Sequence, residues 1–490
     1  MDNHDATLIL ASTLTTQTLH NHRKKFNPFL TIYLISAMAT TELQKWLESG
    51  GAKGYNWLQL EDFPDTGRGL KTLRPLKYND LVLTIPSTFL WTVDGALDDP
   101  ILGPVIHPIK SSLSVEDTLA VFLLFVKSRK EGYEGRRSHV ELLPSSYTTS
   151  LFFDDDELEI CSGSSLYLLT QQLKQQIKDD YLQLFNNLFS KHPDIFPLEK
   201  FTQNDYIWAL CTVWSRAMDF QLPDKQFRCI VPFADLLNHS FDVQLCHIYD
   251  SKSGNLRVVA GKDYAIGEQV FINYGPVPNN RFLRLYGFVL PDNPHDSYDL
   301  VLSTHPLAPL YAQKISMLES AGLKADASFP LKLDDPLPLD VLRYLRIQRL
   351  TPSEVPTIKV NHGARNVVSA RNEAEILGAL IEALEGLLAE FGIPLEELES
   401  RIASGKYQKG SSSWAAAHVS IGEQRVLRMS LQKAKDLLML VVCAQCGKAN
   451  DNNKRCGRCK RVVYCGTACQ KSHYKEHKDI CKTYVAEEQQ

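Results

Sequence analysis

The segment from Cys443 to Cys481 holds seven of the eleven cysteines of this 490-residue chain, together with a spaced histidine. Thiolates and imidazoles are the usual ligands of Zn²⁺, and eight of them fill two tetrahedral sites. A disulfide cluster is the alternative, but CxxC pairs interleaved with Lys, Arg and His are typical of metal ligands. The sequence therefore predicts two structural zinc ions. The ligands form four short pairs: Cys443 and Cys446, Cys456 and Cys459, Cys465 and Cys469, and His477 and Cys481.

Three other segments carry residues that could bind a ligand or act on one. In residues 66–70 two glycines flank an arginine at the start of a strand pattern, and glycine lets a backbone approach a ligand closely. In residues 235–240 four polar side chains follow an apolar approach, and burying them without partners would be costly. In residues 267–275 an apolar strand pattern ends at Asn-Tyr-Gly. Each of these signals is weak when taken singly.

The surrounding pattern predicts the elements that position these segments. Helical periodicity starts at Ser114, where Asp117 completes a capping-box pattern, and continues to about residue 225. Short apolar runs broken by Gly, Pro and Asn lie on both sides and are typical of strands. The expected strands are 57–60, 69–73, 80–86, 227–231, 247–249, 256–259 and 268–273, and the expected insert helices include 165–190 and 204–220. The economical interpretation is a β-rich domain, residues 41–299, interrupted by a helical insert at about 112–225.

Residues 300–442 are expected to form an all-α domain. An apolar stripe recurs at helical spacing from Ile376 to Phe391, and it is more typical of a core than of a cofactor site. Residues 423–442 contain no Gly or Pro, so a helix is expected to lead directly into the cysteine-rich segment, 443–481. Residues 482–490 form a tail. The predicted fold class is therefore α+β and multidomain.

Composition sets the remaining bounds. The net charge of −4, with 44% hydrophobic and 22% charged residues, excludes wholesale affinity for nucleic acid or anionic membranes. No run reaches the eighteen apolar residues that a membrane span needs. Residues 1–40 are expected to be a disordered extension; targeting by residues 1–37 is an alternative that the near absence of arginine does not favour. The four scattered cysteines indicate a reducing compartment, the cytoplasm or nucleus.

The cysteine-rich segment resembles a MYND finger through all eight ligands. In that family the two sites interleave, which implies one zinc on Cys443, Cys446, Cys465 and Cys469 and the other on Cys456, Cys459, His477 and Cys481. His473 competes with His477 as a ligand, but it departs from the family spacing. A MYND finger usually docks a peptide or protein partner.

The chain resembles a SET-domain methyltransferase in three motifs that follow in the same order around a helical insert. They are the glycine pair, the Asn-His pair and the Tyr-Gly pair. The closer resemblance is to the branch related to the Rubisco large-subunit methyltransferase. That branch also has a loop ending Leu-Pro-x-x-Tyr-Thr-Thr, here residues 143–149, and an arginine within Ser-Arg-Ala, here residues 215–217. The resemblance covers about residues 41–440 and implies a helical substrate-binding domain after the SET domain.

The resemblance implies S-adenosylmethionine as the cofactor. The turn at Gly67, Arg68 and Gly69 would pass along it. Asn238 and His239 would bind its amino-acid and adenine parts, mainly through backbone groups. A guanidinium is a natural partner of a carboxylate, so Arg216 would take the methionine carboxylate.

The resemblance also implies a substrate site for a protein lysine. The lysine amine must lose its proton before it attacks, and an apolar channel ending in a tyrosine hydroxyl favours the neutral amine. Tyr274 would supply that hydroxyl, as a general base or as an orienting dipole, and Tyr286 would line the channel. Asp235 is assigned to the substrate side, with a purely structural role in the turn before Asn238 as the alternative.

Two departures from the family leave the substrate open. Met218 follows the Ser-Arg-Ala triplet where plant members of the branch carry Phe, and those members lack a MYND finger. Another SET group carries one inside its SET domain, whereas here it stands at the C-terminus. Methylation of another side chain, such as histidine, is therefore an alternative to lysine. A third hypothesis is a scaffold or adaptor with little catalytic activity, although Tyr274 argues against it. Nucleic-acid binding by the finger is disfavoured because its charge is modest.

Overall fold

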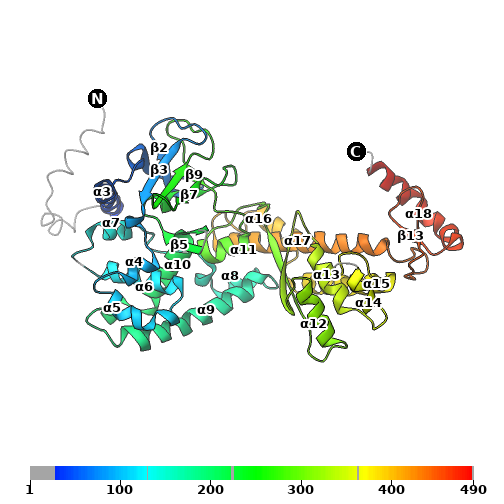
Figure 1. The fold of residues 1–490 in the computed structure, drawn as a ribbon. Coiled ribbons are helices and arrows are strands. Elements are labelled where there is room, and N and C mark those ends of the chain that lie inside the picture. The colour runs from blue at the N-terminus through cyan, green and yellow to red at the C-terminus, as the bar shows by residue number, and fades with distance from the viewer. Residues whose placement is uncertain (1–27, 130, 222–225, 361–362, 488–490) are drawn as a thin grey trace. The chain divides into compact units, whose positions relative to one another are not determined.

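The computed structural model describes residues 28–129, 131–221, 226–360 and 363–487, which fold into two compact units. The first unit comprises residues 1–147 and 177–275, and the second comprises residues 148–176 and 276–490. Helix α9 (Ser165–Leu184) begins in the second unit and ends in the first. Figure 1 traces the elements of both units along the chain.

The first unit is built on short sheets (Figure 1). Most of the predicted strands are confirmed, with ends that differ by a few residues. The strand pairs are β1 (Leu58–Phe63) with β2 (Gly67–Thr72), β3 (Leu81–Pro86) with β8 (Asn255–Val259) and β8 with β7 (His247–Asp250), β4 (Ala217–Gln221) with β5 (Gln226–Ile230), and β6 (Asn238–His239) with β9 (Phe271–Ile272). The last pair is parallel, and the others are antiparallel.

One prediction at the end of the insert was wrong. The helix expected over residues 204–220 is α10 (Gln203–Arg216), and the chain then turns into strand β4. Met218 and Phe220 are buried while Asp219 is exposed, which is the alternation of a strand with one face on the core. The sequence interpretation extended the helix because these apolar residues also fit a helical spacing.

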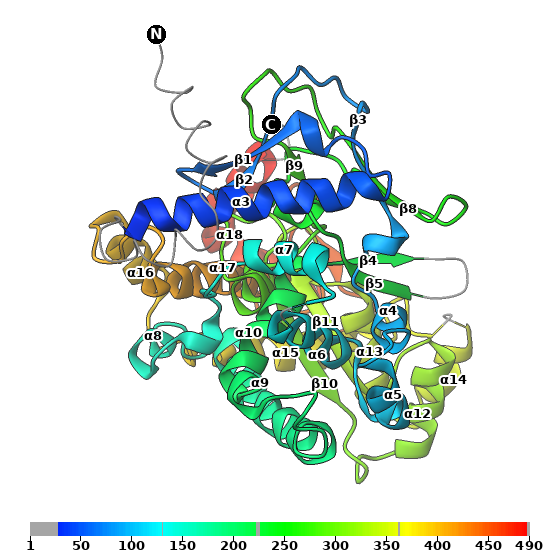
Figure 2. The ribbon, with the colours of Figure 1, turned by 90° about the vertical axis from the view of Figure 1, so that its left-hand side faces the viewer.

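Capping chemistry explains where the main insert helices start. Ser114 and Asp117 form the predicted capping box of α6, and Thr202 and Asp205 form another at the start of α10. Helix α6 packs against α4, α7 and α10 (Figure 2). The helices of this unit are α3 (Pro28–Ser49), α4 (Val93–Leu97), α5 (Gly103–Ile106), α6 (Val115–Ser128), α7 (Glu134–Leu142) and α10, with shorter turns η1 (Tyr55–Trp57), η2 (Ser87–Phe89), η3 (His107–Ser112), η5 (Phe185–Phe189), η6 (Leu198–Lys200) and η7 (Ala234–Leu236).

The prediction that residues 1–40 form a disordered extension is wrong for residues 28–40, because they belong to helix α3. The rest of it, residues 1–27, lies outside the described residues. No helix among the described residues is long and apolar enough to cross a membrane.

The second unit is mostly helical, but its central region is not all-α as predicted. Strands β10 (Ser297–Ser303) and β11 (Asp326–Lys332) form an antiparallel pair across all seven residues of each strand. The helices are α8 (Asp155–Glu159), α11 (Asn279–Arg281), α12 (Tyr311–Ser320), α13 (Leu339–Gln348), α14 (Val355–Val360), α15 (Ala370–Ala389), α16 (Leu395–Ala403), α17 (Ser412–Met439) and α18 (Thr467–Glu487), with turns η4 (Ser150–Phe152) and η8 (Phe282–Tyr286).

The predicted apolar stripe on α15 is confirmed as core. Ile376, Leu380 and Leu384 are buried, and they pack with residues of α13, α17 and the β10–β11 pair. Helix α17 is the longest of the unit, and it leads toward the finger, whose two short strands are β12 (Lys454–Arg455) and β13 (Val463–Tyr464).

Candidate active site and metal centre

The glycine turn is the tip of the β1–β2 hairpin. Gly67 has a φ of +67°, a conformation that glycine adopts without strain. A Cβ on Gly69 would lie 2.8 Å from Nδ2 of Asn238 and 2.3 Å from Nε2 of Gln269, so no larger residue fits without displacing these amides. The two glycines are therefore required for different reasons, one by the backbone angle and the other by close packing.

The structure brings the three sequence segments together. The side-chain amide of Asn238 donates to the carbonyls of Thr66 and Arg68, at 3.3 and 3.1 Å. The segment 267–275 lies beside the glycine turn. The backbone N–H of Val270 donates to the carbonyl of Leu70 at 2.8 Å. Strand β6, which carries Asn238, pairs with β9 from that same segment. A glycine turn, an Asn-His pair and a Tyr-Gly strand end thus form one site.

Positive charge exceeds negative charge around this site. Arg216, at the end of α10, donates from one guanidinium nitrogen to Oδ2 of Asp235 at 3.3 Å and to its backbone carbonyl at 2.9 Å. Arg68 is half-buried nearby, and burial together with the positive charge of Arg216 lowers its pKa. The Asp235 carboxylate is buried beside Arg216, whereas Asp62 beside Arg68 is exposed. The site therefore favours an anionic group in its ligand.

Asp235 also contacts a residue that the sequence analysis missed. His139 of α7 lies with its Nε2 3.1 Å from Oδ2 of Asp235, and both side chains are fully buried. Burial alone would raise the pKa of the Asp235 carboxyl, but the contacts with His139 and Arg216 outweigh it and hold that pKa below its usual range. These contacts give Asp235 a structural role, and its assignment to the substrate side stays a prediction.

We expect Asp235→Asn to destabilise the first unit by about 3 kcal/mol, because it leaves the buried Arg216 charge unpaired. Urea unfolding followed by tryptophan fluorescence measures the loss. Asp219→Asn is the matched control, since Asp219 pairs with Arg228 at an exposed position where ion pairs contribute little. Equal stability of Asp235→Asn and the natural chain would show that the carboxylate carries no charge in the folded protein.

Tyr274 is held by two groups that fix both its backbone and its ring. Its hydroxyl donates to the carbonyl of Leu237 at 2.8 Å, and its backbone N–H donates to Nδ1 of His239 at 3.0 Å. The rings of Tyr274 and His239 stack with their centroids 5.0 Å apart. Since the hydroxyl proton is directed at a carbonyl, the phenolic oxygen presents its lone pairs as an acceptor.

The remaining predicted residue, Tyr286, belongs to the second unit. It closes η8 and packs edge-on against Phe282 and Phe288. Its place in a substrate channel stays a prediction. The sequence analysis also passed over Gln269, which accepts a hydrogen bond from the Thr66 hydroxyl at 2.8 Å. Its position inside the Gly-Glu-Gln-Val strand was the available signal.

The two predicted metal clusters form as expected. Within each group of four ligand atoms, all lie within 4.8 Å of one another. The groups are Cys443, Cys446, Cys465 and Cys469, and Cys456, Cys459, His477 and Cys481. Tetrahedral zinc with Zn–S bonds of about 2.3 Å places its sulfurs about 3.8 Å apart. The Sγ atoms of Cys446 and Cys465 are 3.7 Å apart, so the geometry fits zinc.

His473, the alternative ligand, belongs to neither group. Its Nδ1 lies 3.0 Å from the hydroxyl of Tyr464, and its ring stacks on that of His477. All four positions of each site are filled by protein side chains, so neither metal has an open position for catalysis. The two sites are structural.

The finger is joined to the helical region without a flexible linker. Helix α17 ends at Met439, and the first metal ligand, Cys443, follows after three residues. The carboxylate of Asp451 in the finger accepts the backbone N–H of Ala370 at 2.6 Å, at the first turn of α15. The amide of Asn453 donates to the carbonyl of Val441 at 2.9 Å. The finger therefore contacts both α15 and the end of α17.

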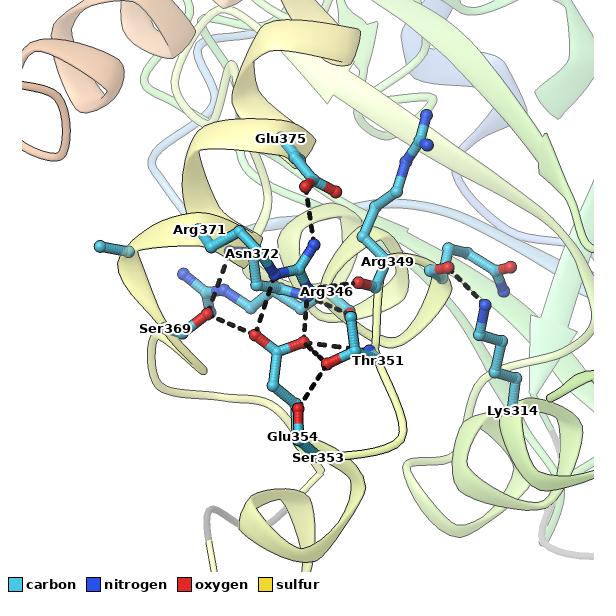
Figure 3. Close-up of polar contacts among 12 residues, drawn as sticks. Lys314, Arg346, Arg349, Thr351, Ser353, Glu354, Ser369, Arg371, Asn372 and Glu375 are labelled. Carbon is cyan, nitrogen blue, oxygen red and sulfur yellow. Dashed lines mark hydrogen bonds and ion pairs between the residues drawn. The ribbon is translucent and has the colours of Figure 1, made fainter. Parts of the chain in front are cut away.

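The start of α15, to which Asp451 binds, is itself fastened by a polar cluster around Glu354 (Figure 3). The Glu354 carboxylate accepts from Thr351, from the Ser369 hydroxyl and from the Arg371 guanidinium. Burial would raise its pKa, but these hydrogen bonds lower it to about 2. Ser369 is also the N-cap of α15, so one carboxylate fixes the helix end that the finger contacts.

Three protein families match successive parts of the chain. The SET domain family matches residues 67–275, the Rubisco LSMT substrate-binding family matches residues 305–427, and the MYND finger family matches residues 443–481. The SET match contains the glycine turn, the Asn-His pair and Tyr274. The MYND match contains all eight metal ligands.

Relatives among curated proteins include actin-histidine N-methyltransferases. The one from Canis lupus familiaris is 26% identical over 411 residues, covering 80% of this chain and 68% of the relative. The one from Danio rerio is 28% identical over 348 residues, covering 68% of this chain and 56% of the relative.

Solved structures with the same fold include the SET domain of LSMT bound to lysine and AdoHcy, and Rubisco LSMT bound to AdoMet. The first has a TM-score of 0.70 at 23% identity and covers 81% of this chain and 91% of that one. The second has a TM-score of 0.69 at 24% identity and covers 81% and 93%. The chain is a SET-domain protein methyltransferase that carries a Rubisco LSMT substrate-binding domain and a MYND finger.

Proposed function

We propose that the chain transfers a methyl group from S-adenosylmethionine to the side chain of a lysine in a protein substrate. The observation that carries the proposal is the Tyr274 hydroxyl. Because the hydroxyl donates its proton to the carbonyl of Leu237, its oxygen is oriented to accept an N–H of a neutral amine. An amine held in this way directs its lone pair along one line, which a displacement at carbon requires.

The residues around Arg216 fit the amino-acid end of the cofactor. Nε of Arg216 and Oδ1 of Asp235 are buried without a hydrogen-bond partner among the described residues. Buried polar atoms in a folded protein are normally paired, so an unpaired donor beside an unpaired acceptor indicates a polar ligand. A zwitterionic amino acid supplies both partners, a carboxylate for Arg216 and an ammonium group for Asp235. The positive charge of Arg68 adds to the attraction for the carboxylate.

When bound, S-adenosylmethionine supplies a sulfonium methyl group and leaves as the neutral thioether S-adenosylhomocysteine. Gly67 allows the tight turn beside it, and Gly69 lets the amides of Asn238 and Gln269 pack against that turn. Asn238 fixes that turn by its bonds to the carbonyls of Thr66 and Arg68. The Tyr274 oxygen orients the substrate nitrogen as an acceptor, and the proton that the amine loses passes to solvent.

Cofactor binding is expected to raise the melting temperature of the full chain. A ligand present at 100 times its dissociation constant stabilises the folded state by about 2.7 kcal/mol. Differential scanning calorimetry with S-adenosylmethionine or S-adenosylhomocysteine measures the shift. If neither ligand binds, the scaffold or adaptor hypothesis replaces the enzyme.

Histidine is the second candidate substrate, and the curated relatives favour it because they are actin-histidine N-methyltransferases. An imidazole with one unprotonated nitrogen is a nucleophile without prior loss of a proton, and its N–H also suits the Tyr274 oxygen. At 25–28% identity these relatives leave the residues of a substrate pocket free to differ.

The deciding experiment labels a cell extract with isotopic methyl donor and the purified full chain, and then sequences the methylated peptides by mass spectrometry. Methyl groups on lysine support the proposal, and methyl groups on histidine replace lysine by histidine. A Tyr274→Phe chain in a parallel reaction identifies labelling by other enzymes in the extract.

The finger adds a second proposed function, the docking of a peptide or protein partner. Both metals are structural, and Asp451 and Asn453 fix the finger to neighbouring helices, so its exposed surface remains for binding. A chain that ends before Cys443 is expected to methylate short peptides normally and the native protein substrate more slowly. Equal rates on the native substrate would show that the finger does not recruit it. Residence in the cytoplasm or nucleus stays a prediction.

A further inference from the structure

His139 and Trp91 form a buried hydrogen-bonded chain that leads to Arg216. The indole N–H of Trp91 donates to Nδ1 of His139 at 3.0 Å. Nε2 of His139 then lies 3.1 Å from Oδ2 of Asp235, which also accepts from Arg216 at 3.3 Å. The Trp91, His139 and Asp235 side chains are fully buried. The chain starts in the core and ends at the guanidinium proposed to bind the cofactor.

The geometry fixes the proton on His139. An indole N–H can only donate, so Nδ1 of His139 must be the acceptor and carry no proton. The single proton of the neutral imidazole therefore sits on Nε2 and is donated to Asp235. A doubly protonated ring would direct an N–H at the Trp91 N–H. His139 thus gives Asp235 a hydrogen bond without cancelling the negative charge that Arg216 needs.

Trp91 is itself held in place by backbone pairing. Its N–H donates to the carbonyl of Ile230 at 2.9 Å, and the N–H of Ile230 donates back to the carbonyl of Trp91 at 3.1 Å. Residues 231–235 follow directly from this bridge, and the N–H of Asp235 donates to the carbonyl of Val231 at 3.0 Å. The backbone segment 230–235 therefore positions both Trp91 and Asp235, the two residues that contact His139.

We propose that His139 is a positioning residue, which orients the Asp235 carboxylate so that Arg216 points its unpaired Nε at the carboxylate of the cofactor. The inference rests on the proposed assignment of Arg216 to that carboxylate. A side chain in the core that only filled space would not need two directed hydrogen bonds, each to a different group. Without the His139 donor, the Asp235 carboxylate can rotate, and Arg216 then keeps only its hydrogen bond to the Asp235 backbone carbonyl, which fixes its direction less tightly.

The test compares two ligands that differ in the amino-acid end. S-adenosylhomocysteine carries the carboxylate, and 5′-methylthioadenosine lacks the whole amino-acid part. In His139→Leu we expect the affinity of the full chain for S-adenosylhomocysteine to fall by about 10-fold, the scale for losing a directed hydrogen bond to a charged group. The affinity for 5′-methylthioadenosine should stay within about twofold of the natural chain. Isothermal titration calorimetry measures both.

Rescue and control variants separate positioning from packing. In His139→Gln the amide N–H₂ can still donate to Asp235, so most of the lost affinity for S-adenosylhomocysteine should return. The Trp91 N–H then donates to the amide oxygen of the glutamine. His247→Leu removes a half-buried imidazole elsewhere in the first unit and should leave both affinities unchanged. In an Arg216→Met background, His139→Leu should cause no further loss.

The outcomes distinguish the two proposals. If the natural chain binds neither ligand, the proposed function fails. If the natural chain binds S-adenosylhomocysteine and His139→Leu binds it equally well, the positioning role is overturned. An equal loss of affinity for both ligands would also overturn it, because a damaged fold does not discriminate between them.

Discussion

Tyr274→Phe is expected to lower the rate of methyl transfer by on the order of 100-fold or more, the scale for removing a positioned polar group. The substitution removes one hydroxyl and little volume. In the natural chain that hydroxyl donates to the carbonyl of Leu237, and its oxygen is the group proposed to orient the substrate nitrogen. The phenylalanine ring keeps the stacking on His239, so cofactor affinity should barely change. Steady-state rates with saturating cofactor and titrations with S-adenosylhomocysteine measure the two effects.

Tyr249→Phe is the matched control for this experiment. Tyr249 packs against Phe220 and Phe227 in the same unit. The substitution therefore removes the same phenolic oxygen at a position outside the proposed active site. Its rate should match that of the natural chain. Full activity of Tyr274→Phe would show that Tyr274 only fills space, and it would remove the observation on which the lysine proposal rests.

Cys456→Ser is expected to unfold the finger and to lower the zinc content from about two ions per chain by at least one. Binding of structural zinc contributes about 10–16 kcal/mol to folding of a small finger, far more than its small core can supply. Cys456 is buried in the group of ligands that includes His477, and the two groups interleave along the chain. Elemental analysis gives the zinc content, and limited proteolysis reports the unfolding.

Two comparisons make the result specific. Cys229→Ser changes a buried cysteine of the first unit that lies in neither metal group, and it should keep both zinc ions. Methylation of a short peptide by Cys456→Ser should persist, because the residues proposed to bind the cofactor all lie within the SET match, residues 67–275. Retention of two zinc ions in Cys456→Ser would show that the cysteine is not a ligand.

The sequence predicted best those features whose residues are close together in the chain. The eight metal ligands lie within 39 residues of each other, and their spacing alone indicated their chemistry. The predicted capping box at Ser114 is an equally local signal for a helix start. The paired strands β10 and β11 were missed because their pairing depends on residues about thirty positions apart, inside a region rich in helical patterns.

The candidate site shows the same limit. Tyr274, Asn238 and Arg216 each stand in a recognisable short motif. His139 does not, and its partners lie 48 and 96 residues away, at Trp91 and Asp235. A lone histidine in a helix gives no sign of which buried carboxylate it will meet, since tertiary packing decides that contact. Strand β4 was misread because the residues after Arg216 satisfy both the helical and the strand spacing.

The direct join between α17 and the finger has a consequence for how partners are selected. When two binding modules are linked by a flexible chain, the local concentration of the second site depends on linker length, and many spacings are tolerated. Here α17 ends three residues before Cys443, and Asp451 bonds the finger to the start of α15, so the spacing between the finger and the helical domain is held by contacts. A bivalent ligand whose two epitopes match that geometry gains avidity, and one with another spacing gains none. The junction therefore selects ligands by the spacing between their two epitopes.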